Sequence, residues 1–214
     1  MKKTKQEVVS EFRCAEILDA ARRVFARKGF TGATVDEIAE AAGLAKGTIY
    51  LYFQSKRGIY RAVLKQSLAA LVDETARNLS AAPTPAEKIR AFIRTRICYA
   101  ERNQDCVSIY QLGGGHLGLT SLNRESRGIY LQQARTLEAV LREASLRGEI
   151  RPIRADAAAF AVFEMTRGVI IQRLLGWSRT TTEEDIAFLF DLVWSGLSGQ
   201  SVRAAEEASL CIES

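Results

Sequence analysis

Proline, histidine and paired cysteines are scarce in this chain of 214 residues. It has three prolines, which argues against the turn-rich composition of a sandwich or barrel and favours helices. The single histidine, His116, excludes a histidine-rich metal site, and the four cysteines form no Cys-x-x-Cys pair. We therefore expect no metal site and no cofactor.

Long hydrophobic runs are also missing. The longest unbroken apolar stretch, residues 157–163, is far shorter than the roughly 18 to 20 residues that a bilayer demands. Three lysines near the start are followed by polar residues where a secretory signal would be apolar. The sequence therefore predicts a cytoplasmic protein without a membrane partner.

Positive charge is confined to the N-terminal third. Residues 1–65 contain 13 Lys and Arg against 7 Asp and Glu, whereas residues 66–214 contain 17 against 18. A local positive field suggests that this third binds a polyanion, whereas the function of the rest of the chain does not depend on its net charge.

Apolar periodicity and end signals predict an all-α fold. Helices are expected over about residues 12–29, 34–42, 45–53, 55–80, 84–100, 123–147, 156–176 and 183–197. Residues 102–125 are compatible with a short helix, a strand or a mobile loop, because the run Gly113-Gly114-Gly115 interrupts the pattern; we expect a short helix followed by a loop.

The last two predicted helices are apolar almost all round. One apolar face serves the chain's own core, and a second copy of the chain is an economical partner for the other, so we expect a homodimer. The alternative is that both helices lie inside the core of a monomer. The interface residues expected from this pattern are Phe163, Ile170, Leu174, Phe190, Val193, Trp194 and Leu197.

The segment from Thr34 to Lys56 has the pattern of a helix-turn-helix. Thr34-Val35-Asp36-Glu37 is a capping box, and Gly43 supplies a positive-φ corner before a second short helix. A helix-turn-helix lays its second helix in the major groove of DNA. The alternative is a helical hairpin whose exposed tyrosines have no binding function.

Inward and outward positions of this segment differ in chemistry. If the apolar side chains point inward, the outer faces carry charge, hydroxyls and flat rings, which suit phosphates and base edges. Gly47 would let a sugar-phosphate backbone approach closely, and Lys56 would add a phosphate contact. The residues expected to contact DNA are Thr34, Ala45, Lys46, Gly47, Thr48, Tyr50, Leu51, Tyr52 and Lys56.

Over residues 12–64 the sequence resembles the tetracycline-repressor-type (TetR) regulators. The residues that carry the resemblance are Phe25, Gly29, Phe30, Thr34, Val35, Ile38, Ala39, Ala42, Gly43, Lys46, Gly47, Thr48, Tyr50, Tyr52, Phe53 and Lys56. The resemblance implies a homodimer that binds a palindromic operator and a C-terminal domain that binds a small effector. Ala45 departs from the family, in which a serine or threonine is common.

These observations lead to a specific expectation of organisation and function. Residues 1–55 would form the DNA-binding domain and residues 56–214 the helical effector-binding and dimerisation domain, with residues 56–80 as the connector. The expected function is a repressor that a small molecule releases from double-stranded DNA. The alternatives are a constitutive DNA-binding regulator and a dimeric scaffold whose basic third binds an acidic partner.

The effector pocket is the least constrained expectation. Aromatic and polar side chains in the middle helices could line a mostly apolar cavity, and the scarcity of acids among them favours an aromatic, lipid-like or anionic effector. The candidates are Phe92, Tyr99, Tyr110, His116, Phe163 and Arg167. An enzyme is not expected, because residues 113–118 satisfy G-x-G-x-x-G without the strand and helix that a dinucleotide site requires.

Overall fold

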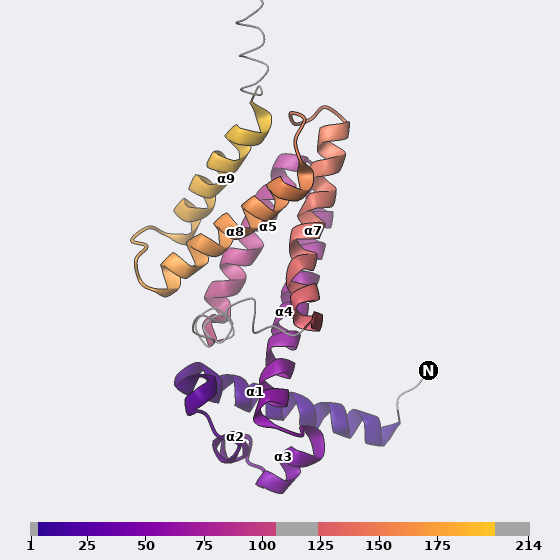
Figure 1. The fold of residues 1–214 in the computed structure, drawn as a ribbon, viewed down its shortest axis with the longest axis vertical. Coiled ribbons are helices and arrows are strands. Elements are labelled where there is room, and N and C mark those ends of the chain that lie inside the picture. The colour runs from indigo at the N-terminus through magenta and orange to yellow at the C-terminus, as the bar shows by residue number, and fades with distance from the viewer. Residues whose placement is uncertain (1–3, 106–123, 200–214) are drawn as a thin grey trace, which may run out of the picture. The chain divides into compact units, whose positions relative to one another are not determined.

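The computed structural model describes residues 4–105 and 124–199, which are helical with short connections (Figure 1). The helices are α1 (Lys5–Gly32), α2 (Val35–Ala42), α3 (Lys46–Tyr52), α4 (Lys56–Ala81), α5 (Pro85–Arg102), α7 (Arg124–Leu146), α8 (Ala155–Leu174) and α9 (Thr182–Ser198). The all-α prediction is confirmed. The expected short helix and loop over residues 102–125 fall largely outside the described residues.

Local capping signals set several helix starts. The Thr34 hydroxyl accepts from the Glu37 amide at 3.2 Å while the Glu37 carboxylate accepts from the Thr34 amide, and Thr84 and Glu87 do the same. Each capping box satisfies two backbone donors that the first helical turn leaves without partners. Both predicted boxes are therefore confirmed.

Helix ends agree with the glycine signals, with one adjustment. Gly43 and Gly148 adopt φ of 66° and 72°, the left-handed conformation that ends a helix. Gly29 also has φ 66°, but it forms a kink rather than the predicted stop, because a further turn continues to Gly32. The predicted helix starting near residue 12 begins earlier, at Lys5, behind a capping box of Thr4 and Glu7.

The chain forms two compact units. The first comprises Met1–Ala70 and Ala100–Ile129, and the second comprises Leu71–Tyr99 and Tyr130–Ser214. The chain passes from one unit to the other within α4, α5 and α7, whereas the functional boundary expected from the sequence lies at residue 55.

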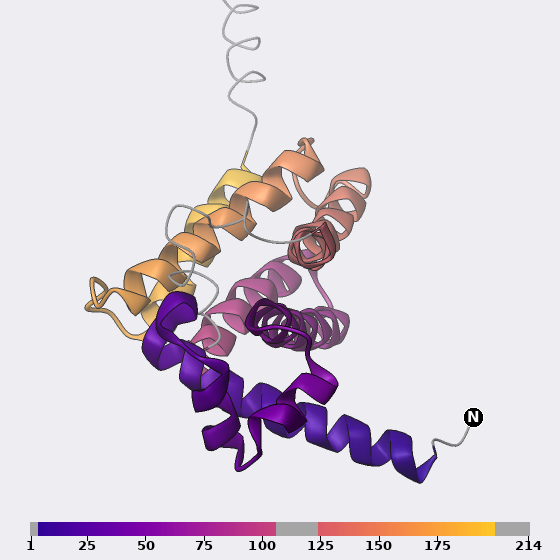
Figure 2. The ribbon, with the colours of Figure 1, turned by 60° about the horizontal axis from the view of Figure 1, so that its bottom comes forward.

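The first unit gathers α1, α2 and α3 around the start of α4 (Figure 2). Its core takes one face from each helix, and the fully buried side chains include Ile17, Ala20, Ala21, Ile38, Ile49 and Ile59. An aromatic cluster joins α1 to α4, because the Tyr60 ring lies 5.2 Å from the Phe25 ring and 4.9 Å from the Phe30 ring. The two short helices are anchored in this core by Ile38 of α2 and Ile49 of α3.

The second unit contains the larger apolar core. Its fully buried side chains include Ile89, Phe92, Ile93, Leu137, Leu141, Phe163 and Ile186. Helix α8 lies beside α9 (Figure 1), and the Arg173 guanidinium donates to the Asp185 carboxylate at 2.6 Å across their connection. In the described ranges no helix has the length and hydropathy of a membrane span.

Helices α8 and α9 carry apolar side chains both in the core and on the surface, and the predicted interface residues remain a prediction. Five of them are buried within the subunit itself and offer almost no surface to a second copy: Phe163, Ile170, Phe190, Val193 and Leu197. Leu174 and Trp194 are half-buried. The apolar side chains that remain exposed on these helices are instead Phe160, Met165, Phe188 and Leu192.

Candidate DNA-binding site

Helices α2 and α3 meet at a tight corner that the sequence encodes locally. Gly43, with φ 66° and ψ 31°, ends α2, and its amide donates to the carbonyls of Ala39 and Glu40. Ala45, in an extended conformation, then precedes α3 and makes no side-chain cap, as the departure from the family pattern predicts. The corner fixes the direction of α3 relative to α2.

The two faces of α3 differ sharply in burial. Ile49 is fully buried, and Thr48 and Tyr52 are half-buried. On the other side, Lys46 and Gly47 are exposed, Tyr50 is 47% exposed and Leu51 is 82% exposed. An outer face with a cation, a phenol and a bare aliphatic side chain can contact both phosphates and base edges.

Two carboxylates of the first turn of α2 bind lysines, one on α3 and one on α1. The Asp36 carboxylate accepts from the Lys46 ammonium at 2.8 Å, and the Glu37 carboxylate accepts from the Lys28 ammonium at 2.5 Å. The hydrogen bond to Asp36 raises the pKa of Lys46. Because both members of the Asp36–Lys46 pair are at least half exposed, the pair is weak and can exchange for a phosphate.

Lys56 has a structural role that the sequence did not suggest. Its ammonium donates to the carbonyls of Ala33 at 2.7 Å and Thr31 at 3.3 Å, and it lies 4.7 Å from the centre of the Phe30 ring. It therefore fastens the start of α4 to the turn between α1 and α2. These partners are more than twenty residues away in the chain, so no local signal could have revealed them.

The predicted effector residues remain a prediction, and the structure gives the burial of four of them. Phe92, Tyr99 and Phe163 are buried, and Arg167 is half-buried and ion-paired with Glu164. Tyr110 and His116 lie outside the described residues. The structure brings Phe92 and Phe163 together around Arg96, which the sequence analysis missed.

Arg96 is a buried cation in the core of the second unit. Its guanidinium lies 4.0 Å from the centre of the Phe163 ring and 5.5 Å from that of Phe92, and it donates to the side-chain carbonyl of Gln133. Other buried polar side chains of this unit are Thr75, Thr95 and Thr166. The core of the second unit thus combines aromatic rings with a cation and hydroxyls.

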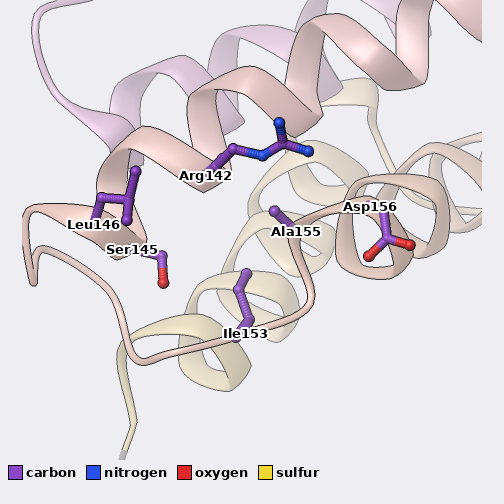
Figure 3. Close-up of a pocket in the computed structure, with 6 residues that line it drawn as sticks. All are labelled: Arg142, Ser145, Leu146, Ile153, Ala155 and Asp156. Carbon is purple, nitrogen blue, oxygen red and sulfur yellow. The ribbon is translucent and has the colours of Figure 1, made fainter.

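A separate surface pocket of about 200 Å³ lies where α7 ends and α8 begins (Figure 3). It is lined by Arg142, Ser145, Leu146, Ile153, Ala155 and Asp156. None of the predicted effector residues lines it, and its two charged groups are engaged elsewhere, Arg142 with Glu138 and Asp156 with Arg154. We assign it no ligand.

Comparisons with known proteins agree with this geometry. Residues 17–63, which span the second half of α1 through the start of α4, match the model of bacterial regulatory proteins of the tetR family. The fatty acid metabolism regulator protein of Bacillus subtilis is 30% identical over 138 residues, which cover 64% of this chain and 70% of that protein. The transcriptional repressor KstR2 of Rhodococcus jostii is 29% identical over 145 residues, with the same coverage.

The fold of a solved relative matches nearly the whole chain. The structure of the regulator FadR from Bacillus subtilis, in complex with stearoyl-CoA, superimposes with a TM-score of 0.73 and 24% identity, covering 85% of this chain and 98% of that one. Together with the helix-turn-helix, these matches identify the chain as a member of the TetR family of DNA-binding transcriptional regulators.

Proposed function

We propose that the protein is a homodimeric repressor that binds a palindromic operator through α3 and is released by a lipid-like, anionic effector. The observation that carries the DNA-binding part is the outer face of α3, where Lys46, Gly47, Tyr50 and Leu51 are exposed. The contacting residues are those expected from the sequence, which add Thr34 before α2, Ala45 before α3, and Thr48 and Tyr52 on α3. Lys56 combines a phosphate contact with its role at the turn.

Successive parts of the chain perform the proposed functions. Residues 1–55 bind the operator, residues 56–214 bind the effector and dimerise, and residues 56–80, most of α4, connect the two functions. An effector in the second domain shifts this connector and alters the spacing of the two recognition helices. Half-sites one helical turn apart, about 34 to 36 Å, tolerate little change in that spacing.

Exposed apolar side chains on α8 and α9 support the homodimer. Phe188 is 66% exposed, Leu192 54% and Phe160 43%, and the connection between the helices adds Trp177 at 71%. Apolar surface gathered on neighbouring helices is typical of an interaction site. A second copy of the same two helices would bury these side chains in a symmetric interface.

An acyl-CoA is the effector class that the relatives favour. One relative is named for fatty acid metabolism, and one solved relative is a complex with stearoyl-CoA. An acyl-CoA is both lipid-like and anionic, which agrees with the expectation from the sequence. Arg96, buried between Phe92 and Phe163, is suited to an anionic group that enters an apolar core.

Duplexes selected from a randomised pool by the purified protein test the DNA-binding part. Affinity for them should fall steeply as salt rises, because phosphate binding releases counterions. Failure to select any duplex at low salt would overturn the proposal, and a non-palindromic consensus would overturn the homodimer on the operator.

Stearoyl-CoA tests the effector part on the same duplexes. We expect it to weaken DNA binding, and the duplex to weaken stearoyl-CoA binding by the same factor, because the coupling is reciprocal. If both bind without mutual effect, the protein is a constitutive DNA binder with respect to this ligand class.

A further inference from the structure

Leu51 differs in its exposure from the other apolar side chain of α3, the recognition helix of the proposed DNA complex. It is 82% exposed, whereas Ile49, two residues earlier on the same helix, is fully buried. One turn before Leu51 lies Gly47, and a Cβ built there would meet no atom within 4 Å. The side of α3 that carries Gly47 and Leu51 is therefore open.

The surroundings of Leu51 fit a DNA duplex rather than an apolar protein partner. Lys46 and Tyr50 flank it on the same short helix, and the first 65 residues carry an excess of positive charge. Such a face is attracted to phosphates. Because Leu51 is an isolated aliphatic side chain on this basic face, we expect its partner to be an apolar group that belongs to a polyanion.

The major groove offers one such group. Each base pair presents hydrogen-bond donors and acceptors there, and thymine alone adds a methyl group at C5. Leucine has no polar side-chain atom, so its favourable contact with a base edge is apolar. Lys46 and Tyr50, in contrast, can bind phosphates or base acceptors.

We propose that Leu51 recognises the C5 methyl group of a thymine in each operator half-site and so selects sequence. This inference rests on the proposed function, because it requires α3 to lie in the major groove. It adds to that function the chemical group of the base that Leu51 recognises.

Replacement of thymine by deoxyuridine tests the proposal, because it removes only the methyl group. Duplexes are first selected with the full-length protein, and each thymine is then replaced in turn. At one position in each half-site we expect the affinity to fall about fourfold, the factor that burial of one methyl-sized group contributes. Replacements at other positions should have little effect.

Leu51→Ala completes a double-mutant cycle with this replacement. The variant should bind the thymine and deoxyuridine duplexes equally well, because its side chain no longer reaches the methyl group. Leu146→Ala is the matched control, since Leu146 is 84% exposed on α7, and it should keep the full difference. The fold should be unaffected, because neither leucine contributes to the core.

Three results separate the inference from the function on which it rests. If no duplex is selected, the proposed function itself fails. If duplexes bind but deoxyuridine is tolerated at every position, the role of Leu51 is wrong. It is equally wrong if Leu51→Ala keeps the thymine preference, which is the result when the variant weakens binding to both duplexes by the same factor, as the loss of a contact to the DNA backbone would.

Discussion

Gly47→Ala should separate the stability of the protein from its affinity for DNA. Gly47 is the second residue of α3, and an added Cβ would meet no atom within 4 Å. Alanine in a helix is more stable than glycine by about 0.5 to 1 kcal/mol. For a chain of this size that gain raises Tm by about 1 to 4 °C. We therefore expect a more stable protein.

The same methyl group should weaken operator binding. If Gly47 allows the sugar-phosphate backbone of DNA to approach α3, an added Cβ displaces that backbone. The displacement lengthens a charge-assisted hydrogen bond between the protein and a phosphate. The loss of one such contact costs about 1.5 kcal/mol, or about tenfold in affinity. Urea unfolding at constant m-value measures the first effect, and fluorescence anisotropy with a selected duplex measures the second.

Gly128→Ala is the matched control. Gly128 lies on α7, is exposed, and likewise has open space around an added Cβ. It should gain similar stability and bind DNA unchanged. If Gly47→Ala binds the duplex as tightly as the wild type, the close approach at Gly47 is refuted, and if it destabilises the protein, the open space around α3 is refuted.

Three further predictions follow from single contacts. Lys56→Met keeps an apolar stem over Phe30 but loses two hydrogen bonds to the turn before α2, so it should lower the free energy of unfolding by about 1 to 2 kcal/mol in urea. Asp36→Asn releases Lys46 and should raise the affinity for random-sequence duplexes about two- to fivefold, as measured by anisotropy. Glu40→Gln on the same helix should raise this affinity less, and an unchanged affinity of the Asp36→Asn variant would show that the pair does not compete with phosphate. Phe188→Glu should convert a dimer to a monomer in analytical ultracentrifugation, and Leu146→Glu should not; a dimeric Phe188→Glu protein would place the interface elsewhere.

The sequence by itself determined the features that depend on neighbouring residues. The capping boxes at Thr34 and Thr84, the positive φ at Gly43 and the uncapped start of α3 each involve residues within four positions of one another. Their hydrogen bonds form whenever the local backbone turns, so the pattern alone is sufficient. The helix-turn-helix was therefore predictable, and with it the family.

Only the tertiary structure decided which apolar face of α8 and α9 is covered. Periodicity identifies residues that share a face, but when both faces are apolar it does not say which one packs on the core. Phe163 and Phe190 proved to be buried, and Phe160 and Phe188 exposed. The contacts of Lys56 with the α1–α2 turn and the burial of Arg96 beside Phe163 have the same origin, because they join residues that are distant in sequence and meet only when the helices pack.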